Sequence, residues 1–450
     1  MPQASPIISV SGLRGIVGQS LTPEIAIRYA AAFAVGLPPG PIVLSRDGRT
    51  TGPMLAASLI GGLTAIGRDV IDAGIAATPT TGVLVRHHGA AGGIQISASH
   101  NPPQYNGLKL FSAEGRVIPA GAGQQVIQRY ESQSPAWAPT ARIGSVIPCD
   151  DPLDAHWALL RETVDIERIR QYHFAVLLDS NHGAGSLLAR RLFDEFGCRA
   201  TIIGGEPDGK FEHTPEPTAE NLRTILPLVS RAGANVGFCQ DPDADRLAVI
   251  DEKGRYIGEE YTLAICVAHV LRSRPGPIVI NCSTSRMSED VANRYGVPLV
   301  RSAVGEANVV DAMLAHQAVL GGEGSGGVID PRVGLVRDSF VGMISLLDAM
   351  AERGMTMSQL ADELPRYEIA KTQIPLPREK LLPALDALEK HFADARSDRL
   401  DGLRLDWPNR WFLVRPSNTE PIVRVVAECR TAAESNRLLS EAAGVVKRVS

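Results

Sequence analysis

Three short apolar segments, rich in β-branched residues and each ending at a polar turn, recur along the chain. A segment of this kind is typical of a strand buried in a parallel sheet. Each is followed by a helix-like segment that ends near a glycine and then by a further apolar run. The three segments are Pro41–Ser45, Phe174–Asp179 and Pro277–Asn281, and the glycines are Gly67, Gly197 and Gly296. Because the copies begin roughly 100 to 130 residues apart, which is the spacing of domains, the pattern predicts three related α/β domains.

The last part of the chain follows a different pattern, typical of a small α+β domain. It contains an amphipathic helix, two strand-like runs and a closing helix, which we expect at Arg378–Arg396, Trp411–Val414, Pro421–Ala427 and Ala432–Val449. Clusters of proline, glycine and aspartate mark the joins between domains. They divide the chain into predicted domains 1–152, 153–252, 253–368 and 369–450.

The composition of the 450 residues favours a globular protein in water, with 44% hydrophobic and 21% charged residues. The net charge of -5 lacks the basic excess that binding a nucleic-acid backbone requires, so nucleic acid is not an expected partner. No apolar run approaches the roughly 20 residues that span a bilayer, and the N-terminus does not resemble a secretory signal. The six cysteines are scattered without a metal-binding spacing. We therefore expect a cytoplasmic protein with free thiols and no membrane contact.

The first segment that carries chemistry is a serine loop, Gly93–Pro103, in which an apolar strand ends in a small polar turn. The prolines at its end prevent it from continuing as a helix. Ser99 is thereby held on a stiff turn as a candidate nucleophile, and His100 and Lys109 are candidate proton carriers. A lone Ser–His pair is more often an ordinary surface turn, so this segment gains weight only from the others.

A second segment, Cys239–Arg246, places three aspartates at alternate positions between two apolar runs. Side chains repeat with period two on an extended loop, so Asp241, Asp243 and Asp245 point to one side and converge on a hard cation. Three carboxylates suit magnesium better than zinc or calcium, whereas the ordinary alternative is an acidic turn. Because the carboxylates carry more charge than Mg²⁺ offsets, a sugar phosphate would need neighbouring cations, and Arg246 stands beside them.

Two further loops suit a sugar phosphate. The glycine-rich segment Gly321–Gly327 must turn tightly or approach a ligand closely, and its Glu323 and Ser325 offer groups that suit sugar hydroxyls. The segment from Val414 to Pro421 and the strand after it combine arginines, hydroxyls and loop amides into a phosphate cradle. Its candidate phosphate-binding residues are Arg415, Ser417, Asn418, Thr419 and Arg424. A flexible loop and a surface turn are the ordinary alternatives.

Two further turns are weaker candidates, and one segment matches a nucleotide-binding motif only in part. The turns Ser11–Gly15 and Ser45–Arg49 combine glycine with arginine. Arg14 is a candidate substrate ligand, although both turns could merely brace the serine loop. Gly204–Lys210 fits the start of a nucleotide P-loop, but Phe211 stands where a magnesium-binding hydroxyl is required, so we reject it.

The order of the four loops resembles that of the α-D-phosphohexomutase superfamily, over nearly the whole chain. The segments that carry the resemblance are S-A-S-H-N-P-P-Q-Y-N-G-L-K, D-P-D-A-D-R, G-G-E-G-S-G-G and R-P-S-N-T-E-P. The resemblance implies an α/β fold of three related α/β domains with mixed sheets and a smaller C-terminal α+β domain. The four domains would surround a central cleft, to which each gives one loop. It also implies a hexose phosphate as the substrate, and we expect a monomer or a homodimer.

The resemblance further implies a covalent mechanism. Ser99 would carry a phosphoryl group whose oxygen joins the three aspartates around one Mg²⁺ ion, while His100 and Lys109 handle protons. The serine would give this group to the sugar, forming a hexose 1,6-bisphosphate that turns over in the cleft and returns its other phosphate. Only a phosphorylated enzyme can begin, so a hexose 1,6-bisphosphate or a kinase must prime it. Positioning and charge neutralisation do most of the work in such transfers.

Two departures from the common family pattern bear on the sugar. Gly327 stands where many members carry histidine, and Asn418 stands where many carry glycine. Together with Asn101-Pro-Pro-Gln-Tyr-Asn, they resemble the archaeal-type phosphoglucosamine mutases. Glucosamine phosphate is therefore the expected substrate, with phosphomannomutase or phosphoglucomutase activity as the alternative.

Two other classes of function remain open. A phosphatase with an aspartyl nucleophile would match Asp241 and Asp243, but that chemistry usually wants threonine where Asp245 stands. A sugar-phosphate-binding regulator without activity is the non-enzymatic alternative. The presence of Ser99, Lys109 and all three aspartates argues against it.

Overall fold

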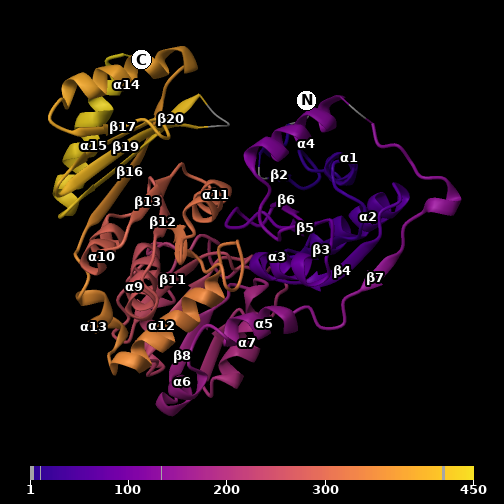
Figure 1. The fold of residues 1–450 in the computed structure, drawn as a ribbon, viewed down its shortest axis with the longest axis horizontal. Coiled ribbons are helices and arrows are strands. Elements are labelled where there is room, and N and C mark those ends of the chain that lie inside the picture. The colour runs from indigo at the N-terminus through magenta and orange to yellow at the C-terminus, as the bar shows by residue number, and fades with distance from the viewer. Residues whose placement is uncertain (1–4, 11, 133, 418–420, 450) are drawn as a thin grey trace.

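The computed structural model of the chain describes residues 5–10, 12–132, 134–417 and 421–449. Its strands form four sheets, of seven, four, four and five strands. Figure 1 shows the first sheet and the C-terminal sheet apart from one another, with the second and third domains between and below them. In this described part of the chain, no helix is both long and apolar enough to cross a membrane.

The first sheet is mixed, with the strand order β1-β2-β6-β5-β3-β4-β7. Strand β3 pairs in parallel with β4 and β5, whereas β6 runs antiparallel to β2 and β5. The strands are β1 Ile7–Ser9, β2 Gly12–Ile16, β3 Ile42–Arg46, β4 Val70–Ile75, β5 Gly92–Ile96, β6 Tyr105–Ser112 and β7 Val146–Pro148. The helices of this region are α1 Pro23–Ala34, α2 Gly52–Ala65, α3 Thr78–His87, α4 Ala120–Ser132 and the short 3-10 helix η1 Thr140–Arg142.

Helices cover both faces of this sheet, as the uninterrupted apolar run of β3 requires. Ile42 and Leu44 belong to a core cluster with residues of α1 and α2, whereas Val43 belongs to a separate cluster with Leu84 and Val85 of α3. Successive side chains of a strand point to opposite faces, so each face of β3 is buried under a different helix layer. The carboxyl ends of β3 and β5 are thereby fixed, and the serine loop begins there.

The second and third sheets repeat a shorter version of this plan. Their strand orders are β11-β10-β8-β9 and β13-β12-β14-β15, parallel except for the antiparallel edge strands β11 and β15. The second domain comprises β8 Ala175–Asp179, β9 Arg199–Ile203, β10 Val236–Gln240, β11 Leu247–Asp251, α5 Asp154–Arg161, α6 Ile166–Tyr172, α7 Gly185–Glu195 and α8 Leu226–Arg231. The third comprises β12 Ile278–Asn281, β13 Leu299–Ser302, β14 Leu320–Glu323, β15 Gly327–Ile329, α9 Glu259–Ser273, α10 Met287–Tyr295, α11 Glu306–His316, α12 Ser339–Arg353 and α13 Met357–Asp362.

The threefold repeat predicted from the sequence is confirmed by these elements. The three apolar segments form β3, β8 and β12, and the helices after them are α2, α7 and α10. Each helix ends within two residues of its glycine, and Gly67, Gly197 and Gly296 have φ values of +85°, +64° and +65°. A left-handed backbone is accessible to glycine without strain, so these glycines can end the helices.

The C-terminal domain is built on a wholly antiparallel sheet with the order β16-β20-β19-β18-β17. Its elements are β16 Glu368–Pro375, β17 Arg396–Asp398, β18 Leu403–Trp407, β19 Arg410–Pro416, β20 Ile422–Cys429, η2 Arg378–Lys380, α14 Leu381–His391 and α15 Ala432–Lys447. The predicted helix Arg378–Arg396 is too long, because α14 ends at His391 and β17 begins at Arg396. Phe392 leaves the helix with φ -110° and ψ 51° and packs against Trp407 and Phe412 instead.

Candidate active site

Ser99 lies just beyond β5, and its backbone is unusual. Its φ is +49°, in the left-handed region that few residues other than glycine adopt, and the residue is only 2% exposed. The amide of Ser99 donates a hydrogen bond to Ser97 Oγ at 2.9 Å. Ser97 Oγ in turn donates to Asp47 Oδ2 at 2.6 Å. The serine is therefore presented on a turn that the neighbouring β3 segment holds in place.

Arg49 supplies most of this support. Its guanidinium donates to the backbone carbonyls of Ser99 and Asn101 at 2.6 Å, and to those of Pro102 and Tyr105 at 2.9 Å. Its Nε pairs with Asp47 Oδ2 at 3.2 Å, and both side chains are buried. Burial raises the pKa of Asp47 to about 6, against the lowering effect of Arg49 and Ser97. The suggestion that the Ser45–Arg49 turn braces the serine loop is confirmed.

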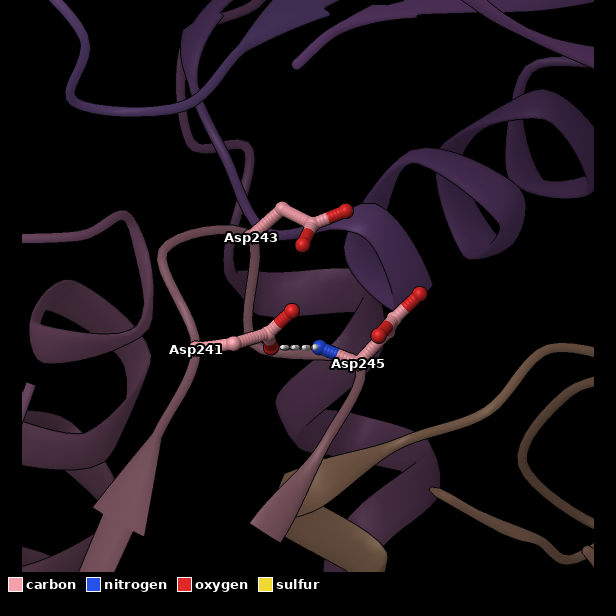
Figure 2. A group of neighbouring side chains, drawn as sticks. All are labelled: Asp241, Asp243 and Asp245. Atoms are coloured by element: carbon pink, nitrogen blue, oxygen red, sulfur yellow. Dashed lines mark hydrogen bonds between the residues drawn. The ribbon is translucent and has the colours of Figure 1, made fainter. Parts of the chain in front are cut away.

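The three aspartates lie on the loop between β10 and β11, and their side chains converge as the sequence predicts. Figure 2 shows the carboxylates of Asp241, Asp243 and Asp245 gathered around one space. All three residues are fully buried, and each offers an oxygen within 4.8 Å of those of the other two. The hydroxyl of Ser99 donates to Asp241 Oδ2 at 2.7 Å, which joins the serine loop to the aspartates. Thr78, at the start of α3, donates to Asp243 Oδ2 at 2.5 Å.

The chemistry of these carboxylates fits a divalent metal ion. Asp243 Oδ1 and Asp245 Oδ1 are buried and have no hydrogen-bond partner within the residues that the structure describes. A buried carboxylate oxygen without a partner is unfavourable, and a hard cation satisfies it. Burial together with the charges of Asp243 and Asp245 raises the pKa of Asp241 well above its ordinary value. A bound divalent cation would reverse that shift.

Lys109 projects from β6 into the aspartate group. Its Nζ lies 3.0 Å from Asp243 Oδ2 and 2.7 Å from Asp245 Oδ2. Burial alone would lower the pKa of Lys109, but the two carboxylates outweigh burial and raise it above the ordinary value. Lys109 is therefore a firmly charged group that offsets part of the carboxylate charge.

His100 lies beside the hydroxyl of Ser99. Its Nδ1 lies 3.3 Å from Ser99 Oγ. Burial and the nearby cations Arg246 and Arg14 lower the pKa of His100 to about 3, so the imidazole is neutral at neutral pH. Arg14, on β2, donates to the side chain of Asn101 at 3.2 Å and thus lies beside the serine loop.

Arg246 serves the aspartate loop through its backbone as well as its charge. Its amide donates to Asp241 Oδ1 at 3.1 Å, as does the amide of Asp245. Its guanidinium lies 4.0 Å from Asp245 Oδ1 and 3.7 Å from Glu216 Oε1. The arginine therefore borders the aspartates, as the sequence predicts, without a close ion pair to them.

Glu323 ends β14 and is nearly saturated with hydrogen-bond donors. Its Oε1 accepts from Asn281 Nδ2 at 2.8 Å and from the amide of Gly305 at 3.1 Å, while its Oε2 accepts from Arg337 Nη1 at 2.5 Å. A carboxylate offers about four acceptor positions, so roughly one is left for a ligand. Ser325 lies beside it, with its Oγ 3.5 Å from Arg337 Nη1.

Arg337 is the functional candidate that sequence reasoning missed. It precedes α12 and connects the two loops, because its Nη2 lies 2.7 Å from Asp245 Oδ2 while its Nη1 binds Glu323. Its Nε lies 3.6 Å from Glu306 Oε2. The only local signal was a single arginine before an aspartate and a serine, which is an ordinary surface pattern. Its role follows from contacts between distant segments.

The phosphate loop lies on the C-terminal sheet. Arg415 is directly opposite Arg424 in the pairing of β19 with β20, and its Nε lies 3.0 Å from Asp401 Oδ2. Ser417 is buried, and its amide donates to the carbonyl of Ile422 at 2.9 Å. The predicted ligands Asn418 and Thr419 lie outside the described residues.

A short chain of contacts connects this loop to the other three. Asp401 Oδ2, which faces Arg415, accepts a hydrogen bond from the amide of Val304 at 3.0 Å. The next amide, that of Gly305, donates to Glu323. The structure thus brings the serine and aspartate loops into direct contact, joins the sugar loop to the aspartates through Arg337, and links the phosphate loop to the sugar loop through Asp401.

Comparison with known proteins agrees with this arrangement. Four models of the phosphoglucomutase/phosphomannomutase family match in order: alpha/beta/alpha domain I over residues 7–136, domain II over 154–254, domain III over 259–367 and the C-terminal domain over 372–445. A phosphoglucomutase/phosphomannomutase of Thermococcus kodakarensis is 35% identical, with 95% of each chain covered. A probable phosphoglucosamine mutase of the same organism is 34% identical, with 97% of each chain covered.

Solved structures give the same answer. The crystal structure of a putative phosphomannomutase from Thermus thermophilus superposes with a TM-score of 0.85 at 25% identity, covering 99% of this chain and 100% of that one. Together with the four family models, these similarities show that the chain belongs to the phosphoglucomutase/phosphomannomutase family of α-D-phosphohexomutases.

Proposed function

We propose that the protein interconverts hexose 6-phosphate and hexose 1-phosphate through a phosphorylated Ser99 and a hexose 1,6-bisphosphate intermediate, with glucosamine phosphate as the preferred substrate. The observation that carries the proposal is the buried hydroxyl of Ser99, hydrogen-bonded to Asp241 within a group of three carboxylates. A structural serine needs no such surroundings. The phosphoserine would be primed by a hexose 1,6-bisphosphate or by a kinase.

Asp241, Asp243, Asp245 and an oxygen of phosphorylated Ser99 would hold one Mg²⁺ ion. When bound, the ion supplies positive charge against the transferring phosphoryl group. Lys109 contributes a further fixed positive charge at Asp243 and Asp245. Neutral His100, next to the serine oxygen, accepts or returns the proton of the reacting hydroxyl. Arg14 lies beside the serine loop and Arg246 beside the aspartates, and both would steer the substrate phosphate towards these loops.

The C-terminal loop would hold the phosphate that is not reacting. Arg415 and Arg424 lie directly opposite one another on neighbouring strands, and like charges in that position repel. A phosphate between them would replace this repulsion with charge-assisted hydrogen bonds. Ser417, Asn418 and Thr419 would complete the cradle with hydroxyls, an amide and loop backbone.

The sugar would be read by Glu323 and Ser325. The bisphosphate must turn within the cleft, so the sugar loop has to bind the same molecule in two orientations. It can do so by holding the 3- and 4-hydroxyls, which exchange places when the sugar turns. Position 2, where glucosamine, glucose and mannose differ, would then be read weakly, and we expect activity on more than one of these phosphates.

The proposal includes the organisation of the whole chain. Each of the domains 1–152, 153–252, 253–368 and 369–450 would supply one loop to the cleft. The six cysteines are free thiols, which agrees with a cytoplasmic location. The assembly would be a monomer or a homodimer, with no nucleic acid or membrane as partner.

The experiment is mass spectrometry of the protein combined with turnover assays. The protein is incubated with glucose 1,6-bisphosphate and Mg²⁺ and digested, and the phosphorylated residue is identified. Turnover is then measured with glucosamine, glucose and mannose phosphates. We expect phosphate on Ser99, none in Ser99→Ala, and the highest kcat/KM for glucosamine phosphate. Binding of all three sugar phosphates without phosphate on Ser99 and without turnover would instead identify a sugar-phosphate-binding regulator.

A further inference from the structure

Among the described residues, Arg337 is the one side chain that forms ion pairs with both the aspartate loop and the sugar loop. One guanidinium nitrogen binds Asp245 Oδ2 at 2.7 Å and the other binds Glu323 Oε2 at 2.5 Å. The arginine side chain is 11% exposed. Its planar fork fixes the angle between the two carboxylates as well as their separation.

These bonds decide which oxygen of Asp245 is available. Asp245 Oδ2 is shared by Lys109 at 2.7 Å and Arg337 at 2.7 Å, whereas Oδ1 has no hydrogen-bond partner among the described residues. A carboxylate held in this way cannot rotate without losing two charge-assisted bonds. Partners of this kind orient a metal ligand, and their loss typically lowers metal affinity 10- to 100-fold.

The backbone that carries Arg337 is rigid. The next residue, Asp338, is the N-cap of α12 and accepts a hydrogen bond from the amide of Phe340 at 2.8 Å. The amide of Asp338 donates to the carbonyl of Val328 on β15, also at 2.8 Å. Arg337 therefore extends from a fixed point between a helix and a sheet edge, which suits a residue that must position others.

Gly327 makes room for this side chain. A methyl group added at Gly327 would lie 2.3 Å from Cδ, 2.7 Å from Cγ and 2.9 Å from Cβ of Arg337, and these are its three nearest atoms. Contacts this short cannot exist, so the stem of Arg337 would have to leave its place. The φ of Gly327 lies outside the left-handed region, and alanine is compatible with the strand there.

We propose that Arg337 is a positioning residue that fixes the metal ligand Asp245 and the sugar-loop carboxylate Glu323 relative to one another, and that residue 327 lacks a side chain because Arg337 occupies its space. The inference rests on the proposed function, which assigns Mg²⁺ to Asp245 and the sugar to Glu323. It adds that the metal and sugar sites share one support. A change at Gly327 therefore alters both sites without altering any charge.

The test is a double-mutant cycle on Mg²⁺ affinity, measured by calorimetry on the dephosphorylated full chain. Gly327→Ala keeps every charge and is expected to lower Mg²⁺ affinity about 10- to 100-fold and to raise the KM for sugar phosphate. In the Arg337→Met background, the same Gly327→Ala change is expected to alter Mg²⁺ affinity by less than about twofold, because the methionine stem that it displaces carries no guanidinium to hold Asp245. Arg337→Met changes the local charge as well as the position of the two carboxylates, so it serves only as the background of the cycle.

Two variants nearby serve as matched controls. Gly334→Ala adds the same methyl group where the nearest atom is Arg86 Nη2 at 3.7 Å. Arg332→Met removes an arginine that is 40% exposed and pairs with Asp330. Both are expected to bind Mg²⁺ as the wild type does.

Unchanged Mg²⁺ affinity in a folded Gly327→Ala variant, or an equal loss in both backgrounds, would overturn the proposal. If Gly327→Ala does not fold by circular dichroism, Arg337→Lys replaces it, because lysine keeps the charge but lacks the fork that joins two carboxylates. The expected loss of Mg²⁺ affinity is the same, and its absence overturns the proposal. The titration does not use turnover, so a wild type without mutase activity would overturn the proposed function and leave this inference standing.

Discussion

The serine loop and the phosphate loop each depend on an arginine, but the two arginines are engaged in opposite ways. Arg49 is 1% exposed, and its guanidinium is occupied by Asp47 and four backbone carbonyls of the serine loop. Arg415 pairs with Asp401 at its Nε and lies across from Arg424, with 15% of its side chain exposed.

The difference separates a structural arginine from one that can bind a ligand. A guanidinium has five N–H donors, and those of Arg49 are directed at the protein itself. Arg415 faces another cation on the neighbouring strand, an arrangement that an anion stabilises. Arg415 lies in a loop that the sequence marks as functional, whereas Arg49 lies in a turn that was expected at most to brace the serine loop. Their partners distinguish them, because the donors of Arg49 are occupied by the protein, whereas Arg415 is partly exposed and faces Arg424.

The largest expected effect concerns the serine that Arg49 supports. Ser99→Ala should lower mutase turnover by more than about 1000-fold, because the transferred phosphoryl group would have no acceptor on the enzyme. The free energy of unfolding should fall by only about 1 kcal/mol, since the hydroxyl donates one hydrogen bond, to Asp241, and packs in no core. Steady-state kinetics and denaturant unfolding measure the two quantities. Turnover within about tenfold of wild type would exclude the covalent intermediate.

Arg49→Met should have the opposite effect, because its main consequence should be a lower free energy of unfolding. It leaves Asp47 buried without its cation and four carbonyls without a donor, and breaking a buried pair costs about 3 to 5 kcal/mol in the free energy of unfolding. Arg49→Lys keeps the charge and should fall between Arg49→Met and the wild type. Urea denaturation checks both variants. A stable Arg49→Met protein would mean that the serine loop needs no brace.

Arg415→Ala should weaken sugar-phosphate binding while leaving stability nearly unchanged. Loss of one charge-assisted hydrogen bond is worth about 1.5 to 3 kcal/mol, or about 10- to 150-fold in affinity. Arg410→Ala, at the start of the same strand and stacked on Trp407, is the control and should keep the wild-type affinity. Calorimetry with a sugar phosphate makes the comparison. Equal affinities in the two variants would make the phosphate loop an ordinary turn.

The smallest effect is expected for Ser97→Ala, which removes one connection of the serine-loop brace. Ser97 donates to Asp47 and accepts from the amide of Ser99, so its loss should lower the free energy of unfolding by about 1 kcal/mol. Thermal unfolding measures the change. A loss as large as that of Arg49→Met would show that the serine, rather than the arginine, carries the brace.

The sequence predicts well what depends on local pattern. Apolar runs located β3, β8 and β12, and alternate aspartates on one loop predicted the convergence that Figure 2 shows. The spacing of apolar positions, the residues that end helices and the chemistry of a loop are all properties of neighbouring residues, so a single sequence reveals them. The order of the four loops supplied the rest of the prediction.

What the sequence could not show depends on contacts between distant segments. Arg337 and Asp245 are 92 positions apart in the sequence, and Thr78 and Asp243 are 165 positions apart.

Strand β18 was missed for a related reason. Its Arg404 and Asp406 have the pattern of exposed charges, but they form a buried ion pair, with Nε and Oδ2 2.8 Å apart. Charge along a sequence predicts exposure unless a partner elsewhere compensates it.

The brace formed by Arg49 also bears on how freely the serine loop can change during evolution. Arg49 recognises carbonyl oxygens of residues 99, 101, 102 and 105, and every amino acid carries such an oxygen. The brace therefore depends on the path of the backbone and not on the side chains along it. Substitutions at Tyr105, whose contribution to Arg49 is its carbonyl, should be tolerated wherever the new residue can follow the same path. The loop can thus accumulate neutral variation around a fixed nucleophile, while position 49 itself admits almost none.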